Sequence, residues 1–509
     1  MTKTSRALGT IAALGAGAVA ALASYDLSQR KHSVLRNYPV IGHMRYLLEG
    51  IRPELQQYFI ERNWDGRPYD RDTRSIIYER AKGTHGEQAF GTERDVNADG
   101  HEWLVHSSAP VKQPGDIPRV TIGGPDCTKP YSMALLNVSA MSFGALSANA
   151  VRAMNRGAHD GGFAQDTGEG GLSSYHLEND GDLIWEIGTG YFGTRTKDGR
   201  FDPKQFAEKA SDDRVRCVSL KLSQGAKPGI GGVLPAPKVS PEIASVRGVP
   251  VHEKCVSPPH HQAFDTPAGL IRFIAHMREL SGGKPVGMKL CVGSRIEVLA
   301  MCKAMIEVGT APDFIIVDGA EGGTGAAPLE YEDHVGMPLT QGLMIMHNAL
   351  VGTGLRSTIR LGASGKIAAG NDIVKRLIQG ADFTNAARAM MMAVGCIQAQ
   401  RCHTDKCPVG VTTQNPRRAR ALDVDSKSTR VTNYQSATVA EAVRLMASMG
   451  VSDPSQLTPR MLRRNVDVHE SQSYEELYEW LRPGELLEAA PESWAADWNR
   501  ASADLFPMP

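Results

Sequence analysis

The sequence has no excess of charge of either sign. Its 509 residues include 56 Lys and Arg and 56 Asp and Glu, so the formal net charge is zero. Proteins that bind a nucleic-acid backbone need a field of positive charge, which this composition does not supply. We therefore expect no nucleic-acid partner.

Cysteine is sparse and irregularly spaced. Eight cysteines in a chain of this length do not resemble the disulfide framework of a small secreted protein, which indicates a reducing compartment. Aromatic residues make up only 6% of the chain, against 41% hydrophobic residues overall. The length suits one large α/β domain of about 250 to 300 residues with flanking segments.

Charge is missing altogether from one N-terminal run, Ala7 to Ser24, which is at the lower limit for spanning a bilayer core of about 30 Å. Basic residues flank this run: Lys3, Arg6, Arg30, Lys31, Arg36 and Arg45. Most of them follow it, so the positive-inside rule predicts a membrane-associated protein with a single N-terminal helix and its catalytic domain in the cytoplasm. A signal peptide cleaved near Ala21–Ala23, or a helix packed on the protein, is the alternative.

From about Asn137 the sequence pattern is typical of a parallel sheet, because short apolar runs alternate with helical segments. The predicted strands are 135–142, 163–167, 183–187, 216–222, 285–291, 313–319, 358–364 and 382–388. This count predicts an α/β fold with a (β/α)8 TIM barrel. A doubly wound sheet is the alternative, but no G-x-G-x-x-G motif follows an early strand.

Four regions follow from this pattern: an anchor (1–29), an N-terminal cap (30–125), the barrel (126–425) and a helical C-terminal extension (426–509). A helical stretch is predicted near residues 46–63 of the cap. In the extension, Ser473 and Glu476 have the spacing of a capping box. The extension could pack on the barrel or contact a second copy in a homo-oligomer.

Glycine-rich loops follow the last strands, at the end of a barrel where phosphate is usually bound. The candidate residues are Gly322, Gly323, Gly362, Ser364, Gly365, Ala387 and Arg388. Their backbone N–H groups, the start of the helix after residue 370 and the Arg388 guanidinium could hold an anion. A phosphate-bearing cofactor such as FMN is predicted; the alternative is that the glycines only make tight turns.

Cations and one amide converge on the predicted mouth of the barrel. Lys221 and Gln224 end a strand, Lys227 and Arg247 belong to the long loop that follows, and Lys289 ends the next strand. Long loops without secondary structure are usually functional, and these side chains suit a dicarboxylate or a reduced flavin. The alternative for any one lysine is a solvated surface charge.

Cys396, Cys402 and Cys407 fall within twelve positions, and Pro408 follows the last of them. The spacing allows a zinc site completed by His403, an iron–sulfur cluster or three unrelated thiols. Zinc sites favour closer pairs, whereas the Cys-Pro ending is typical of ferredoxins. A cluster is therefore the favoured interpretation.

Seven motifs occur in order over about residues 110–420: MSFGALS, TGEGG, QGAKPG, KVSPEIASVRG, SPPHH, EGGTGAAPL and CPVGVTTQ. Together they resemble the FMN-binding synthase domain of glutamate synthase. The whole chain resembles the stand-alone FMN-binding glutamate synthase family. The resemblance implies a (β/α)8 barrel with FMN, and a 3Fe-4S cluster held by the three cysteines in the loop 396–407. In that family the cluster passes electrons to FMN, which reduces 2-iminoglutarate formed from 2-oxoglutarate and ammonia.

The departures from the family concern nitrogen and substrate. No glutaminase region precedes the barrel, so ammonia or an amine is the expected nitrogen source. The resemblance places 2-oxoglutarate contacts on Lys227 and Arg247. A family Gln is Val233 here and a family Glu is Ile230, a loss of about 1 to 3 kcal/mol per polar contact. A less polar 2-oxoacid or a substituted amine would suit these changes.

The expected roles place Ser142, Gly144, Lys221, Gln224 and Lys289 against the flavin ring. Glu169, in TGEGG, is predicted to manage protons; the alternative is a structural carboxylate. The other predicted catalytic residues are Lys227 and Lys289. His260 and His261 are interpreted mainly as loop anchors.

The predicted function is reductive amination of a 2-oxoacid or imine. The sequence shows no site for a nicotinamide nucleotide, so a ferredoxin-like carrier or a separate reductase is the expected electron donor. Two alternatives stay open: an amino- or hydroxy-acid dehydrogenase that feeds a membrane acceptor, and a non-catalytic electron-transfer module.

Overall fold

The computed structural model describes residues 3–84 and 86–507 of the chain. These residues form two compact units, residues 1–72 and residues 73–509, which we call the N-terminal unit and the barrel unit. Each unit is described by itself below.

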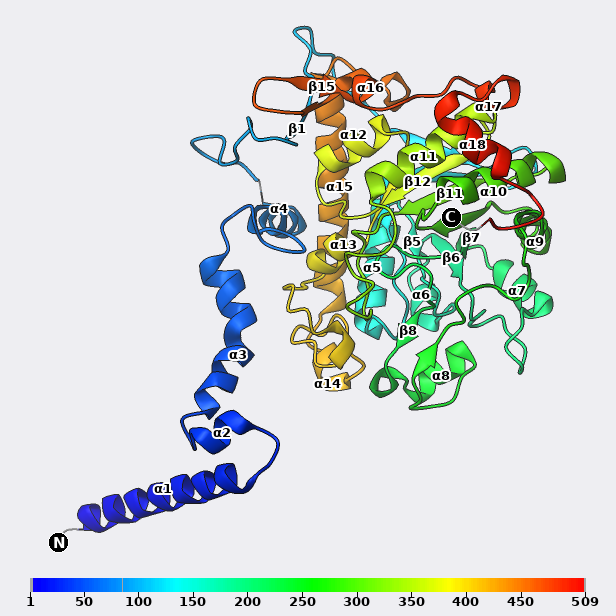
Figure 1. The fold of residues 1–509 in the computed structure, drawn as a ribbon. Coiled ribbons are helices and arrows are strands. Elements are labelled where there is room, and N and C mark those ends of the chain that lie inside the picture. Colours follow the sequence, from blue (N-terminus) through cyan, green and yellow to red (C-terminus); the bar gives the residue numbers. More distant parts are fainter. Residues whose placement is uncertain (1–2, 85, 508–509) are drawn as a thin grey trace. The chain divides into compact units, whose positions relative to one another are not determined.

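The barrel unit is built around eight parallel strands that close into a barrel in the order β10-β11-β12-β13-β4-β5-β6-β7 (Figure 1). The strands are β4 (Leu136–Val138), β5 (Gln165–Asp166), β6 (Leu183–Ile187), β7 (Val215–Lys221), β10 (Val286–Leu290), β11 (Phe314–Asp318), β12 (Arg360–Ser364) and β13 (Phe383–Ala386). Each of the eight segments predicted from the sequence overlaps one of them, and seven contain the whole strand; β7 begins one residue before its segment. The predicted α/β barrel is therefore confirmed.

Helices follow the strands, as a parallel barrel requires. They are α5 (Ala148–Gly161), α6 (Ser174–Leu177), α7 (Pro203–Ala210), α8 (Pro241–Arg247), α9 (Pro267–Leu280), α10 (Arg295–Val308), α11 (Leu339–Gly352), α12 (Gly370–Ile378) and α13 (Arg388–Ala393). Several begin at polar caps written in the sequence: the hydroxyls of Ser147, Ser240 and Thr266 accept backbone N–H groups of the first turn.

A hairpin of β2 (Arg119–Ile122) and β3 (Tyr131–Ala134) closes the N-terminal end of the barrel. Side chains of this hairpin join a buried cluster with side chains of the strands: Ile122, Tyr131, Met133, Ala164, Ile184, Cys217, Phe314, Ile316 and Phe383. The core is thus apolar at this end. Polar groups are left to the opposite end, where the strands point their carboxyl termini.

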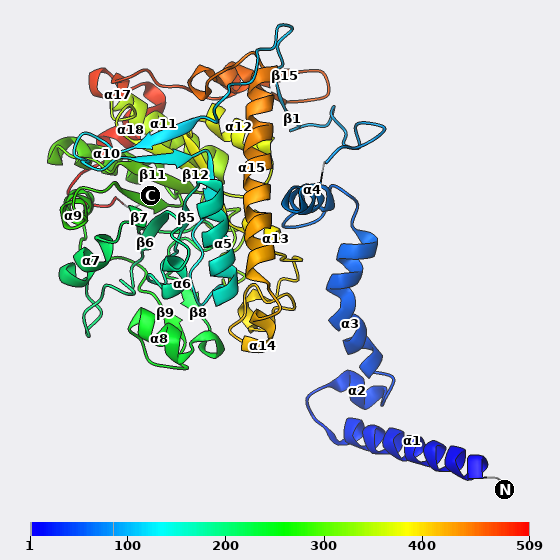
Figure 2. The same cartoon turned by 180° about the vertical axis from the view of Figure 1, so that it is seen from behind.

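The short helix α14 (Pro416–Ala419) precedes the C-terminal extension, whose helices are α15 (Val424–Ser448), α16 (Tyr474–Leu477), α17 (Glu485–Glu488) and α18 (Glu492–Arg500). Figures 1 and 2 show the long helix α15 lying along α5. Their close approach requires Gly157, where a Cβ atom would lie 2.7 Å from the Val431 side chain. The predicted capping box is present at α16, since Ser473 N donates to Glu476 Oε2 over 2.7 Å.

The predicted helical extension also contains strands. β14 (Leu462–Asn465) pairs with β15 (Ser471–Ser473) and with β1 (Glu102–Leu104), in the segment that precedes the barrel. The remaining elements of the barrel unit are α4 (Arg71–Lys82), the strand pair β8 (Val233–Leu234) and β9 (Cys255–Val256), and four 3₁₀ turns at 236–238, 402–404, 454–456 and 459–461.

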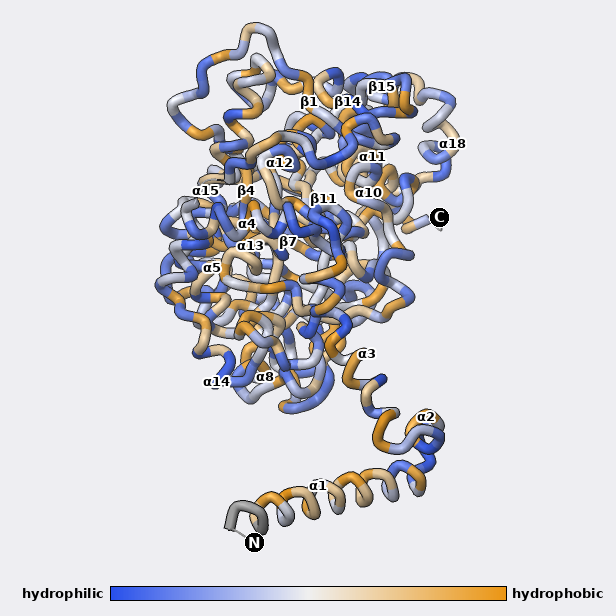
Figure 3. The backbone as a smooth tube through the Cα atoms, turned by 90° about the vertical axis from the view of Figure 1, so that its left-hand side faces the viewer, coloured by the Kyte–Doolittle hydropathy of each residue, from blue (hydrophilic) through white to orange (hydrophobic). Residues whose placement is uncertain are grey.

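The N-terminal unit consists of α1 (Lys3–Ser28), α2 (Ser33–Asn37), α3 (His43–Leu55) and a π-helical turn at Gln56–Ile60. Residues Ala7–Ser28 form a helix long and apolar enough to cross a membrane, with a mean hydropathy of 1.8. Figure 3 shows this stretch in hydrophobic colours up to its polar end. A signal sequence meets the same criteria of length and composition.

Candidate active site

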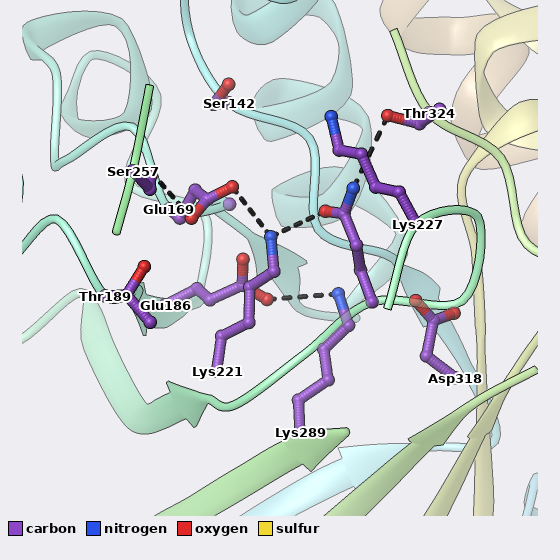
Figure 4. A network of polar contacts seen from close by, with 12 residues as sticks. Ser142, Glu169, Glu186, Thr189, Lys221, Lys227, Ser257, Lys289, Asp318 and Thr324 are labelled. Atoms are coloured by element: carbon purple, nitrogen blue, oxygen red, sulfur yellow. Dashed lines mark hydrogen bonds and ion pairs between the residues drawn. The ribbon is translucent and has the colours of Figure 1, made fainter. Parts of the chain in front are cut away.

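Two lysines lie side by side at the mouth of the barrel, and each forms an ion pair with a carboxylate (Figure 4). Lys221 of β7 is paired in register with Lys289 of β10. The Lys221 Nζ atom lies 2.7 Å from Glu169 Oε1, and the Lys289 Nζ atom lies 3.1 Å from Glu186 Oε2. These side chains are between 1% and 13% exposed, so both ion pairs are screened little by solvent.

Glu169 is held in its charged form. Burial opposes the charge, but the Lys221 ammonium, with Arg247 and Lys227, keeps the pKa of Glu169 below its ordinary value. Glycines let the chain close around this carboxylate. A Cβ atom at Gly188 would lie 2.5 Å from Oε2, and one at Gly232 would lie 2.0 Å from Oε1. Near neutral pH, Glu169 is a base or a fixed negative charge, not an acid.

Lys227 is a buried amine with a lowered pKa. Its Nζ atom donates to the carbonyl oxygen of Ala326 over 2.5 Å. Burial and the neighbouring charge of Lys221 lower the pKa of Lys227 to about 8. This lysine can therefore change charge close to physiological pH.

Arg247, the other predicted substrate contact, is also buried and reaches the loop after β4. Its Nη2 atom donates to Ser142 Oγ over 3.1 Å and to the carbonyl oxygen of Phe143 over 3.2 Å. Within residues 3–84 and 86–507 no carboxylate lies within ion-pair distance of this guanidinium. Lys221, Arg247 and Lys227 thus all act on the charge of Glu169, and only Lys221 is within ion-pair distance of it among the described residues.

Gln224 links two loops of the mouth. Its Oε1 atom accepts a hydrogen bond from Lys221 Nζ over 2.6 Å, and its Nε2 atom lies 3.5 Å from Thr324 Oγ1, at the limit of hydrogen bonding. In the same loop, Gly225 N donates to Asp318 Oδ2 over 2.9 Å. The loop after β7 is therefore fixed to the end of β11.

The residues predicted to bind phosphate fall into two places. Arg388 Nη2 donates to the carbonyl oxygen of Glu321 over 2.5 Å, and a Cβ atom at Gly323 would lie 2.8 Å from the Arg388 Cδ atom. Gly322 and Gly323 are thus gathered with Arg388. Gly362 instead lies within β12, where a Cβ atom would meet the Phe383 ring at 2.6 Å.

Ser364 and Gly365 follow at the end of β12, and Ala387 lies directly before α13. Ser364 is in register with Asn385 of β13 and lies 3.2 Å from Ser139, oxygen to oxygen. The predicted contribution of the helix after residue 370 is not supported. Asp372 Oδ2 already accepts the N–H groups of Ala368 and Ala369 over 3.0 and 2.9 Å. Its carboxylate disfavours an anion at the start of α12.

Buried polar atoms without a partner mark the inside of the barrel. Within the described parts of the chain, Gln165 Oε1, Ser219 Oγ and Asn385 Oδ1 are buried and make no hydrogen bond. All three lie on barrel strands. Buried polar groups are normally paired, so the two amide oxygens fit N–H donors of a bound polar ring, and the Ser219 hydroxyl fits either a donor or an acceptor. The residues present therefore suit FMN.

Sequence reasoning missed Gln165, Glu186, Ser219 and Asn385. Their signal is a polar residue inside an apolar strand; Glu186, for example, interrupts the run LIWEI. His261 is placed as an anchor: its Nε2 atom donates to the carbonyl oxygen of Lys221 over 2.8 Å. Burial lowers the pKa of His261 to about 4, so the ring is neutral. His260 is exposed.

The cysteine segment, by which we mean residues 396–414, lies against the loop after β4, which carries Ser142 and Gly144. Gln414 Nε2 donates to the carbonyl oxygens of Gly144 and Leu146 over 3.0 and 2.8 Å. Ser147 N donates to the carbonyl oxygen of Val411 over 2.9 Å. The loop predicted to line the flavin thus touches the segment predicted to hold the cluster.

The three thiols differ in their tendency to ionise. Burial raises the pKa of Cys396 to about 12. Burial also opposes the thiolate of Cys407, but hydrogen bonds from Thr412 and from the backbone N–H groups of Val409 and Val411 lower its pKa. Cys402 is half-buried, and none of the three forms a disulfide. A donor set of free thiols, one with N–H groups aimed at sulfur, suits an iron–sulfur cluster.

No three His, Cys, Asp or Glu side chains converge closely enough to hold a single metal ion in the part of the chain that the structure describes. Neither the zinc interpretation with His403 nor the cluster interpretation therefore has a converged ligand set among the described residues. A residue that sequence reasoning missed, Lys238, is buried here. Its Nζ atom donates to the carbonyl oxygens of Ala145 and Cys402 over 2.8 and 3.2 Å.

Comparisons with known proteins agree with this geometry. The profile of a family described as "Conserved region in glutamate synthase" matches residues 124–452. The "glutamate synthase large subunit-like protein YerD" of Bacillus subtilis is 37% identical over 471 residues, 84% of this chain and 89% of its own length.

The "archaeal-type glutamate synthase [NADPH]" of Thermotoga neapolitana and the "archaeal glutamate synthase [NADPH]" of Methanocaldococcus jannaschii are both 32% identical to this chain. The matches cover 65% and 66% of this chain, and 62% and 63% of those proteins. Among solved structures, a mutant flavocytochrome b2 with pyruvate bound aligns at 13% identity with a TM-score of 0.42, covering 86% of this chain and 91% of that one.

Proposed function

The chain belongs to the glutamate synthase family, and on that premise we propose that it catalyses the reductive amination of 2-oxoglutarate or a related 2-oxoacid or imine. Ammonia or an amine is the proposed nitrogen source. FMN and a 3Fe-4S cluster are the proposed cofactors. At the level of enzyme class, the protein is a glutamate synthase-like oxidoreductase that acts on CH–NH₂ groups.

The observation that carries the proposal is a pair of buried cations at the barrel mouth, Lys227 and Arg247, that form no ion pair within the described residues. Lys227 and Arg247 have no carboxylate within ion-pair distance in the described residues, and Glu169 alone offsets Lys221 there. Buried charges need partners, because removing an ion from water costs several kcal/mol. A substrate with one or two carboxylates would supply the missing negative charge.

FMN, when bound, supplies the two electrons that reduce the C=N bond. The side chains that would hold it are Ser142, Gln165, Ser364, Asn385 and Arg388, together with the glycines of the loops after β11 and β12. The protein excludes water from this region, since Glu186 and Lys289 below it are nearly fully buried.

Proton movements are assigned from the charge states. When ammonia adds to the 2-oxoacid, a proton passes from nitrogen to the oxygen that leaves as water, and reduction of the imine consumes two electrons and two protons. Glu169 is ionised and can accept the proton from nitrogen and return it to the departing oxygen. Lys227, with a pKa of about 8, can donate a proton to the substrate. Glu169 and Lys227 thus take opposite roles.

The electron donor is proposed to be a ferredoxin-like protein or a separate reductase that meets the cysteine segment. Support comes from the contacts that fix this segment to the loop of Ser142 and Gly144. We also propose that α1 is retained as a membrane anchor with the barrel unit in the cytoplasm, because Ala7–Ser28 is apolar and basic residues follow it.

The test is anaerobic reoxidation of the photoreduced full-length protein. Reoxidation that needs both a 2-oxoacid and ammonia or an amine is the expected result. Reduction of the oxidised protein by an amino or hydroxy acid, with no reoxidation by 2-oxoacids, would instead favour the dehydrogenase alternative. Transfer in neither direction would leave only the electron-transfer module.

The cluster is tested separately. Cys402→Ser should remove iron and its broad visible absorption while FMN remains, because one of three ligands is lost. Cys127→Ser is the matched control, since Cys127 is a free, half-buried thiol outside the cysteine segment. Purified protein that contains zinc without iron would contradict the assignment.

A further inference from the structure

An unpartnered apolar face runs along α3 and the π-helical turn after it. Its residues are Met44, Leu47, Leu48, Ile51, Leu55, Tyr58 and Phe59, which are between 38% and 81% exposed. Within α3 and the turn no residue is buried. The spacing of three and four residues places these side chains on one stripe of a helix about 27 Å long. We call this set the α3 stripe.

The opposite side of α3 is polar and carries Arg45, Glu49, Arg52 and Gln56. Over residues 29–60 there are five basic and two acidic residues. An exposed apolar stripe of this length is a site of interaction, not an ordinary surface. Its combination with a basic surplus is typical of a helix that lies in the headgroup region of an anionic membrane.

The connection between α1 and α3 is specified by buried polar contacts. Asp26, near the end of α1, is fully buried and accepts the N–H group of Val40 over 2.8 Å. Its two carboxylate oxygens lie 2.9 and 3.1 Å from His43 Nε2, at the first residue of α3. Val40 has a φ of 66°, which a β-branched residue adopts only when its surroundings require it.

The turn itself is closed by one glutamine. Gln29 Oε1 accepts the N–H groups of Lys31 and His32, each over 2.8 Å, and Gln29 Nε2 donates to the carbonyl oxygen of His32 over 2.8 Å. The start of α3 is therefore held next to the polar end of α1. If α1 crosses a bilayer, α3 begins at its surface.

We propose that the α3 stripe lies in the headgroup region of an anionic lipid bilayer, as an interfacial helix that continues from α1. The proposal commits to lipid because the stripe begins beside a helix apolar enough to span a membrane, and because basic residues surround it. It goes beyond the proposed catalytic function and rests only on the proposed α1 anchor.

The test uses the full-length protein in vesicles of phosphatidylcholine and phosphatidylglycerol. A photoreactive carbene probe that resides in the acyl chains labels residues in contact with lipid, and mass spectrometry maps the labels. We expect labels on α1 and on the α3 stripe, with Arg45, Glu49 and Arg52 unlabelled.

A pair of variants sharpens the result. Leu48→Glu/Ile51→Glu places two carboxylates in the stripe and should lower labelling of α3 by about tenfold or more, because two aliphatic side chains no longer favour lipid. The control Glu49→Gln/Gln56→Glu changes the polar side without altering its net charge and should leave labelling unchanged. All four positions are exposed or outside the folded core, so the variants should fold.

The outcomes separate the two membrane proposals. Labels on α1 without labels on the α3 stripe would overturn this inference while keeping the anchor, and would assign the stripe to a second copy or to the barrel unit. Labels on neither helix would overturn both. Equal labelling of the stripe in pure phosphatidylcholine would contradict the role of anionic lipid.

Discussion

The buried pair of Lys289 and Glu186 offers the sharpest test of how the barrel mouth is held together. Lys289→Met removes the ammonium that lies 3.1 Å from Glu186 Oε2. The side chains are 5% and 1% exposed, so water cannot replace the lost partner. Breaking a buried ion pair by deleting one partner costs about 3 to 5 kcal/mol. We expect the free energy of unfolding to fall by about that amount.

The loss should depend on pH with a definite sign. Burial and the charge of Glu186 already raise the pKa of Asp166 well above its ordinary value, and Lys289 opposes this. Without Lys289 the folded pKa of Asp166 should lie further above its unfolded value. A group of this kind stabilises the fold at low pH and loses that contribution as pH rises. The deficit should therefore grow between pH 5 and pH 8, by at most about 1.4 kcal/mol per pH unit per proton.

The assay is equilibrium urea denaturation of the full chain at saturating FMN, followed by fluorescence. Trp185 reports on the site directly, because it precedes Glu186 on β6 and its ring is fully buried against Phe206. The double variant Glu186→Leu/Lys289→Met should recover most of the loss, since an apolar pair can replace a buried ion pair.

Asp198→Asn is the control, because the Asp198–Arg200 pair is more than 70% exposed on both sides and should contribute about 0 to 1 kcal/mol. A loss below about 1 kcal/mol in Lys289→Met, or a double variant as unstable as the sum of the single ones, would refute the reasoning.

Three further predictions concern the substrate loop. Binding of 2-oxoglutarate, measured by calorimetric titration, should weaken about tenfold per pH unit above pH 8 as Lys227 loses its proton. Lys227→Arg should abolish this pH dependence. An affinity of the native protein that does not change with pH would contradict the prediction. Gly232→Ala places a Cβ atom 2.0 Å from Glu169 Oε1 and should lower kcat/KM by up to about 100-fold, whereas Gly325→Ala, with open space around it, should not. Val233→Gln should tighten 2-oxoglutarate binding by about 1 to 3 kcal/mol, with Val256→Gln on the paired strand as its control; equal effects would rule out a specific contact.

The barrel could be predicted from sequence because its signal is local. Strands covered on both faces need nearly continuous apolar runs, and each of the eight runs overlaps a strand in the structure. The capping box at Ser473 could be predicted for the same reason, since both partners lie within one turn. The pairing of β1 with β14 could not, because Glu102 meets Arg464 far along the chain.

The candidate site shows the same division between local and distant information. Lys221, Lys227 and Arg247 were found from their place in one loop, but their partners were not. Glu186 lies 103 positions from Lys289, and Lys238 lies 164 positions from Cys402. Charge states depend on such partners, so the opposite roles of Glu169 and Lys227 emerge only from the three-dimensional arrangement.

One short loop joins the two halves of the proposed reaction. Arg247 and Lys238 belong to the same segment of the chain. Arg247 donates to the Ser142 hydroxyl and to the Phe143 carbonyl oxygen. Lys238 donates to the carbonyl oxygens of Ala145 and Cys402. Arg247, the proposed substrate contact, and Lys238, which binds the cysteine segment, are thus nine residues apart and bind the same loop. A shift of the segment that contains Lys238 and Arg247 must also move the loop after β4 and the cysteine segment. This is because buried cations cannot leave their carbonyl partners without a large desolvation penalty. In the reaction we propose, the loop after β4 therefore connects substrate binding mechanically with electron entry.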